Sequence, residues 1–150
     1  MGRFERFTLA IASIYKCWHQ IASSELQRFG LKGPHAIYLV CLKSHYEGLT
    51  MPELCQLLSK DKADVSRMIR LLEDKSLVSK DGGYRASYHL TEEGDKIASI
   101  VVKKAKNAVK LAGKDLTDEQ RDIFYCALES IVMNLKKIYE EVNKNNESIL

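Results

Sequence analysis

The chain has 150 residues, of which 45% are hydrophobic and 29% are charged, and its formal net charge is +3. This size and composition predict one soluble domain with a hydrophobic core of its own. The modest positive charge permits a nucleic-acid partner but does not by itself indicate one. The apolar runs are too short to span a bilayer, so we expect a cytoplasmic protein without a membrane partner.

The first predicted helix runs from about Phe4 to Phe29. Apolar residues recur along it at alternating spacings of three and four, the a/d seam of a helix that packs along another helix. This seam consists of Phe4, Phe7, Ile11, Ile14, Trp18 and Ile21. Gly30 is expected to cap the helix, and Pro34 to open the next one.

The middle of the chain is expected to hold short helices followed by a two-stranded hairpin. The helices are predicted at 35–46, 50–60 and 62–75, and the strands at 77–79 and 85–90, around the turn signal Asp81-Gly82-Gly83. Thr50 and Glu53 form a capping box for the second of these helices, whose Leu54, Leu57 and Leu58 should face the core.

Two further helices complete the chain. Thr91 caps a helix that continues to about Ala112, and a capping box from Thr117 to Gln120 begins the last helix. The last helix carries a second apolar seam: Phe124, Leu128, Ile131, Leu135, Ile138 and Val142. Because helices with an apolar seam lie at both ends of the chain, we predict a homodimer that forms through them. The alternative is an intramolecular helical hairpin.

This order of elements predicts a winged helix-turn-helix, a mainly α fold with a small β-hairpin wing. We expect a single domain over 1–150, with the winged region at 34–92 and the dimerisation helices at 4–30 and 95–143. The helix at 62–75 is amphipathic at 100° per residue. Its inward face comprises Val65, Met68, Ile69 and Leu72, and its outward face Ala63, Ser66, Arg67 and Arg70.

The outward face suits a DNA major groove. Small side chains let a helix approach closely, and arginines donate to phosphates or guanine edges. Lys80, Tyr84 and Arg85 flank the hairpin tip, where an arginine can enter the minor groove. The alternative is a solvated, charged surface.

Two acids in the first turn of this helix need an explanation. Asp61 is expected to be the N-cap, which accepts a backbone hydrogen bond and suits the helix dipole. Three interpretations remain open for Asp64: it completes the cap or orients Arg67, it accepts from a cytosine amino group, or it is a plain surface acid.

The run "GLTMPELCQLLSKDKADVSRMIRLLEDKSLV", followed by "YRASYHLTEEG", resembles the MarR family of bacterial transcriptional regulators. The resemblance implies an obligate homodimer, a recognition helix at 62–75, a wing at about 79–88 and binding to palindromic double-stranded operators. By position it assigns these residues to the DNA-facing helix: Lys62, Ala63, Asp64, Ser66, Arg67 and Arg70. Arg85 matches the wing arginine. Two departures are a short wing and Ser76, where the family usually has glycine.

The family commonly releases DNA on binding a small, often aromatic, ligand. The candidate ligand-binding residues in this chain are Tyr15, Trp18, His19, His35 and Tyr38; the alternative for each is core or interface packing. We therefore expect a DNA-binding transcriptional regulator, a repressor, that a small effector releases.

Other kinds of site are not expected. The four cysteines never form close pairs, so no metal site is predicted, and each thiol should be buried. No cofactor is expected either. No nucleophile with its base is visible, so we predict no catalytic residues and no enzyme. Two rival functions remain: a thiol sensor that uses Cys17, and a winged-helix module that contacts proteins without binding DNA.

Overall fold

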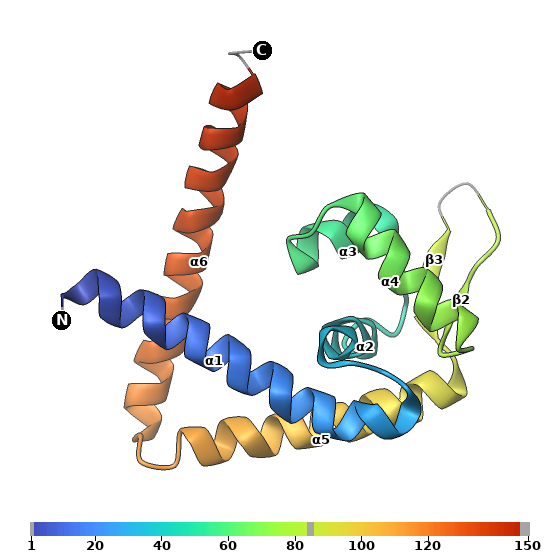
Figure 1. The fold of residues 1–150 in the computed structure, drawn as a ribbon, viewed down its shortest axis with the longest axis horizontal. Helices are drawn as coiled ribbons and strands as arrows, with labels where there is room; N and C mark the ends of the chain where they lie inside the picture. Colours follow the sequence, from blue (N-terminus) through green and yellow to red (C-terminus); the bar gives the residue numbers. More distant parts are fainter. Residues whose placement is uncertain (1, 84–85, 148–150) are drawn as a thin grey trace. The chain divides into compact units, whose positions relative to one another are not determined.

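The computed structural model describes residues 2–83 and 86–147. The chain divides into two compact units, Met1–Asn107 and Ala108–Leu150. The helices are α1 (Arg3–Leu26), α2 (Ala36–Lys43), α3 (Met51–Leu58), α4 (Lys62–Asp74), α5 (Glu92–Ala112) and α6 (Asp118–Glu147), and the strands are β1 (Leu49–Thr50), β2 (Val78–Lys80) and β3 (Ser87–Leu90). This order confirms the predicted winged helix-turn-helix (Figure 1).

Within the described residues, no helix combines the length and the apolar character that a membrane crossing requires. The expected domain boundaries stay a prediction.

The strands form one antiparallel sheet in the order β1-β3-β2. Val78 pairs with Leu90 and Lys80 with Tyr88, so β2 and β3 make the predicted hairpin. The segment before α3 also contains a strand, β1, because Leu49 pairs with Tyr88 on the free edge of β3. The wing is thereby attached to the start of α3 as well as to the end of α4.

The core of the first unit lies where α2 meets α3, α4 and the end of α1. Its largest fully buried side chains are Tyr38, Leu26, Leu39, Leu42, Leu54, Ile69, Leu72 and Val65. Leu58 packs against this core, but the prediction for Leu57 is wrong, because its side chain is 49% exposed. The buried side of α3 runs through Leu54, Leu58 and Cys55, and at 100° per residue Leu57 lies about 60° beyond Leu54 on the other side.

Side chains cap the two helices of the helix-turn-helix as predicted. Glu53 Oε2 accepts from the Thr50 backbone N–H and from the Thr50 hydroxyl, each at 2.7 Å, at the start of α3. These bonds hold the pKa of Glu53 below its usual range. Asp61 Oδ1 accepts from the Asp64 backbone N–H at 2.8 Å, which makes Asp61 the N-cap of α4.

Left-handed residues end successive helical segments. Gly30, the predicted cap, has φ 66°, where glycine meets no steric penalty. Ser59 ends α3 at φ 51°, and Ser76 follows α4 at φ 57°. The serine that replaces the expected glycine at position 76 therefore does adopt the strained conformation, which costs about 1–2 kcal/mol for a non-glycine residue.

A tight junction joins α5 to the end of the α4–β2 turn. The Thr91 hydroxyl donates to the Ser76 carbonyl at 2.7 Å and accepts from the Gly94 N–H at 3.1 Å. The Thr91 N–H donates to the Leu77 carbonyl at 3.1 Å. A β-carbon on Gly94 would overlap the Leu77 carbonyl oxygen and lie 2.9 Å from its carbon. The "LTEEG" motif is thus a hydrogen-bonded backbone junction that needs threonine and glycine.

The second unit contains the predicted cap of the last helix. The Thr117 N–H donates to Gln120 Oε1 at 2.9 Å, and the Gln120 N–H donates to Thr117 Oγ1 at 3.2 Å. Arg121 donates to the Gly113 carbonyl at 2.9 Å and so fixes the turn before α6. The α6 seam is exposed in the single chain, with Phe124 at 48% and Leu135 at 50%. An isolated chain leaves this apolar stripe in water.

Replacing Gly94 with alanine should destabilise the protein. The new β-carbon forces the Leu77 backbone or α5 to shift, and overpacking of this kind costs about 1–3 kcal/mol. Urea denaturation followed by circular dichroism measures the change. Ser99→Ala, at an exposed position one turn further along α5, is the control and should stay within about 0.5 kcal/mol of the wild type. A Gly94→Ala protein of unchanged stability would contradict the close approach.

Candidate nucleic-acid interface

The rotation of α4 about its axis is fixed by its apolar side. Val65, Ile69 and Leu72 are almost completely buried, and Met68 packs against the same core. At 100° per residue this burial turns the opposite side of the helix outward. The predicted inward and outward faces of α4 are thus observed.

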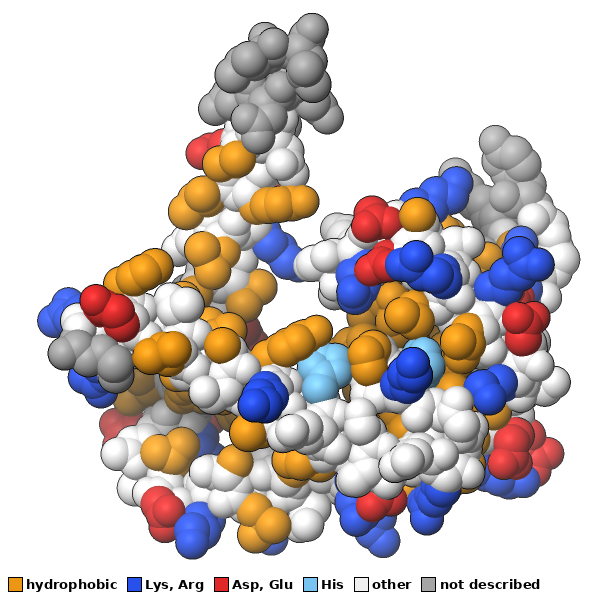
Figure 2. All heavy atoms as spheres, in the orientation of Figure 1, with side chains coloured by type: hydrophobic (Ala, Val, Ile, Leu, Met, Phe, Trp, Pro, Cys, Tyr) orange, Lys and Arg blue, Asp and Glu red, His pale blue; other side chains and the backbone are white. Residues whose placement is uncertain are grey.

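The outward side of α4 is a shallow open surface. Its lining residues are Ala63, Ser66, Arg67, Arg70, Leu71 and Asp74. The structure therefore brings together four of the predicted DNA-facing residues, with small side chains first and arginines after them. Lys62 is exposed at the first position of the helix. Figure 2 shows Lys and Arg side chains over this helix, with acidic side chains among them.

Asp64 lies beside this surface and not in its lining. Its Oδ1 accepts from Arg67 Nη2, and its Oδ2 lies 3.2 Å from Lys60 Nζ. The hydrogen bond from Lys60, and then that from Arg67, hold the pKa of Asp64 below its usual range. Lys60 was not among the predicted site residues, although its spacing of four from Asp64 is a recognisable ion-pair signal.

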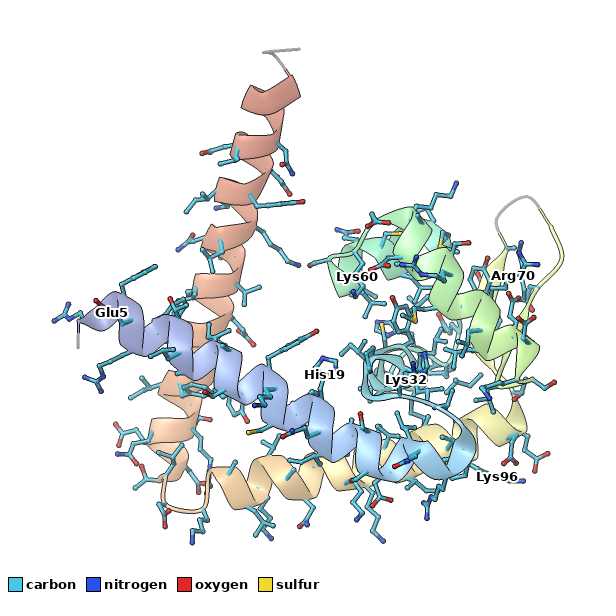
Figure 3. The ribbon with its side chains drawn as sticks, in the orientation of Figure 1. Glu5, His19, Lys32, Lys60, Arg70 and Lys96 are labelled. Carbon is cyan, nitrogen blue, oxygen red and sulfur yellow. The ribbon has the colours of Figure 1, made fainter. Side chains whose placement is uncertain are left out.

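The wing places one described cation near the start of α3. Lys80 is exposed at the end of β2, and its Nζ lies 5.7 Å from the centre of the Tyr88 ring. Tyr84 and Arg85, the other predicted wing residues, lie outside the described residues. Figure 3 shows Lys60 at the turn into α4 and Arg70 on the side of α4 toward the wing.

A histidine–carboxylate pair that sequence reasoning missed lies at the base of the wing. His89 Nε2 is 2.7 Å from Asp81 Oδ2, across the hairpin. The Asp81 N–H also donates to the Ser87 carbonyl at 2.9 Å. Gly48 has φ 85°, and its missing side chain leaves room for the His89 ring. The alternation of "RASYHL" indicated a strand but carried no signal for this pair.

Two of the predicted ligand-binding residues, His19 and His35, lie at the start of α2, and Tyr15 contacts His19. The Tyr15 and His19 rings of α1 contact each other at a tilt of 59°, with centroids 4.2 Å apart, and a β-carbon on Gly33 would lie 3.2 Å from His19 Nδ1. His35 is buried, and its Nδ1 accepts from the Lys32 N–H at 2.8 Å. Figure 3 shows His19 between α1 and α2.

The other two predicted ligand-binding residues point elsewhere. Trp18 lines a crevice of about 10 Å³ against α5, beside the 2.7 Å ion pair of Glu25 with Lys104. Tyr38 is buried, and its hydroxyl has no hydrogen-bond partner among the described residues. Burial, and then Asp64, raise the pKa of Tyr38 to about 12. The structure does not collect the predicted ligand residues in one cavity, and their role stays a prediction.

The cysteines differ from their prediction. Cys17 and Cys126 are exposed in the single chain, and Cys41 and Cys55 are half-buried. The two exposed thiols belong to the long end helices, whose surfaces are largely uncovered. Burial raises the pKa of Cys41. Among the residues whose placement is described, no group of His, Cys, Asp and Glu could hold a metal ion.

No protein-family model matches the chain, and no curated protein matches its sequence. Solved structures do match its fold. A putative MarR family transcriptional regulator from Listeria monocytogenes, in complex with a 26mer DNA, is 22% identical, with a TM-score of 0.84 over 96% of each chain.

Two further structures show the same likeness. A MarR transcriptional regulator from Methanosarcina mazei Go1 is 24% identical, with a TM-score of 0.79 over 92% of this chain and 94% of that one. MepR from S. aureus, in a DNA complex, is 20% identical, with a TM-score of 0.75 over 85% and 97%. The chain therefore has the winged-helix fold of MarR family regulators.

Protonation of His35 should make stability fall at mildly acidic pH. Burial, and then Lys32 and Lys75, lower the pKa of His35 in the folded state. Below the unfolded value of about 6.5, the unfolded chain binds the proton and the folded chain does not. The free energy of unfolding thus declines as pH falls from 6.5, and this loss levels off below the folded pKa.

Urea midpoints at successive pH values between 7.5 and 5 measure this effect. His35→Asn retains an acceptor for the Lys32 N–H and should weaken the pH dependence, whereas His45→Asn, at an exposed histidine, should leave it unchanged. Equal slopes for His35→Asn and the wild type would refute the role of His35.

Proposed function

We propose that this protein is a transcriptional regulator that binds a palindromic double-stranded DNA operator as a homodimer. One observation carries the proposal: burial of Val65, Ile69 and Leu72 presents Ala63, Ser66, Arg67 and Arg70 together on one open side of α4. A helix that enters a major groove needs small residues at close approach and forked donors beside them.

The proposed interface is α4 with its neighbouring wing. Arg67 and Arg70 are assigned to base edges or phosphates, Lys62 to phosphates and Lys80 to the backbone beside the wing. Tyr84 and Arg85 join this set on the sequence alone. The likeness to two structures that contain DNA supports the assignment. A dimer would place two such helices against successive major grooves, about 34–36 Å apart.

Dimerisation is proposed through the apolar seams of the end helices. Phe4 on α1 is 78% exposed and Ile138 on α6 is 55% exposed, values unusual for large apolar side chains of a monomer. A second copy of the chain is the simplest cover for these stripes. Such a regulator acts on DNA in the cytoplasm and needs neither a catalytic residue nor a cofactor.

Repression, and release by a small aromatic effector, complete the proposal and rest on the resemblance to the family. The tilted pair of Tyr15 with His19 is the described feature that best fits an aromatic ligand, because Tyr15 is exposed and His19 is half-buried. The buried Tyr38 fits such a role least, since its side chain is 1% exposed.

Binding to DNA is tested with fragments that co-purify with the protein, which are sequenced to define an operator. Arg67→Ala should weaken operator binding by about 1–3 kcal/mol, because it removes a forked base contact, and should weaken binding to random duplex less. Fluorescence anisotropy at several salt concentrations measures both affinities.

Lys106→Ala, which removes an exposed cation from α5, is the charge-matched control and should leave operator binding unchanged. A wild-type protein that enriches no sequence, or that binds DNA independently of salt, would overturn the proposed function. A winged-helix module for protein contacts would then be the better reading.

The oligomeric state provides a separate test. Sedimentation equilibrium should give twice the 17.1 kDa of the chain. Ile131→Glu puts a charge in the α6 seam and should shift the protein toward monomer. Ser130→Glu adds the same charge about 100° away around the helix and should leave a dimer. A wild-type monomer at every concentration would contradict dimerisation.

A further inference from the structure

The carboxylate of Asp64 joins two cations at the start of α4. One oxygen accepts from Arg67 Nη2, and the other lies 3.2 Å from Lys60 Nζ. Lys60 belongs to the turn between α3 and α4, where its N–H donates to the Cys55 carbonyl at 3.1 Å. The acid therefore ties a helix side chain to the preceding turn, at the edge of the proposed DNA-binding face.

Stability explains this acid only in part, through its favourable place in the first turn of α4. The N-cap of α4 is already supplied by Asp61, whose side chain accepts from the Asp64 N–H. Among the residues that the structure describes, no backbone N–H donates to the Asp64 side chain. The Arg67 side chain is 70% exposed and that of Lys60 40%, and ion pairs this open to water contribute little to folding.

The acid does have a consequence for DNA. A carboxylate near phosphates repels them, and a cation already paired with an acid releases fewer counterions on binding. The lowered pKa of Asp64, due first to Lys60 and then to Arg67, keeps its charge in place throughout the neutral range. Loose electrostatic binding to arbitrary sequence is thus weakened at this end of the helix.

The two arginines of this face differ in their carboxylate partners. Arg70 has no carboxylate oxygen within 4.0 Å in the described part of the chain, whereas Arg67 has Asp64. The bond through Nη2 leaves the other N–H groups of the Arg67 guanidinium to donate to a base edge. Arg67 also lines the open surface of α4, and Asp64 stands beside it.

We propose that Asp64 is a positioning residue that determines the sequence specificity of the DNA-binding face. It holds Arg67 in the geometry of a base contact and withholds both Arg67 and Lys60 from random phosphates. This inference rests on the proposed DNA-binding function. Arg70 and Lys62 then supply general attraction to DNA, and the Asp64–Arg67 pair supplies discrimination.

The test removes the charge of Asp64 while keeping its shape. Asp64→Asn should raise affinity for random duplex about tenfold and lower the ratio of operator to random affinity by at least as much. The slope of log affinity against log salt should steepen by about one for each freed cation, and so by up to about two. A role confined to holding the helix start would change neither the slope nor the ratio.

A matched control separates position from charge. Asp61→Asn removes the same charge three residues earlier, and asparagine still caps the helix. It should alter the affinity ratio much less than Asp64→Asn does. Asp64→Glu should restore part of the discrimination, and circular dichroism should show equal helix content in all three variants.

Double substitutions provide the decisive readout. Arg67→Ala should reduce operator affinity by a smaller factor in the Asp64→Asn background than in the wild type, because the arginine is no longer aimed. Arg70→Ala should reduce it by the same factor in both backgrounds. Additive effects at 64 and 67 would overturn the proposal.

The outcomes also separate this inference from the function on which it rests. If the wild type selects an operator with a steep salt slope but Asp64→Asn changes both affinities in parallel, the role of Asp64 is refuted and DNA binding stands. If the wild type shows no salt-dependent DNA binding, the proposed function and the role of Asp64 are both refuted.

Discussion

The burial of one side of α4 is the constraint on which the rest of the first unit depends. Val65, Ile69 and Leu72 enter a core made by α2, α3 and the end of α1, and this burial fixes the rotation of α4 about its axis. The buried residues of α4 therefore determine which of its residues face the solvent. Both ends of α4 are then fixed, by Asp61 at its start and by the turn through Ser76 at its end. A loss of apolar contact in the core would turn the arginines away from the surface without altering them.

Charge arrangement matters more in this protein than charge excess. The net charge of +3 over 150 residues is too small to draw the whole molecule onto DNA. The cations Lys62, Arg67 and Arg70 on α4 are balanced by the acids Asp64, Glu73 and Asp74 on the same helix. A surface of this kind has a weak field at long range and strong directional bonds at short range. Such a balance favours a binder that leaves wrong sites quickly over one that holds any duplex.

Periodicity and capping signals were enough to predict the elements and the outward face of α4. The stripe through Val65 and Ile69 leaves one way to orient that helix, and the capping box of Thr50 with Glu53 depends on local spacing alone. Predictions that depend on distant neighbours were poorer. Leu57 has the spacing of a core residue, yet the buried side of α3 runs through Leu54 and Leu58 and leaves Leu57 at its exposed edge. The pair of His89 with Asp81 depends on the strand register, which no periodicity of the sequence reveals. The predicted effector residues do not meet around one cavity.

The junction of Thr91 and Gly94 with Ser76 and Leu77 has a mechanical consequence. Hydrogen bonds and direct backbone contact leave no space for a hinge between the end of α4, the start of β2 and the first turn of α5. Because these segments are locked together, a rotation of α5 at this end must carry the base of the wing and the last turn of α4 with it. A bend or twist at this end of α5 thus moves the base of the wing and the last turn of α4 together, as one rigid body.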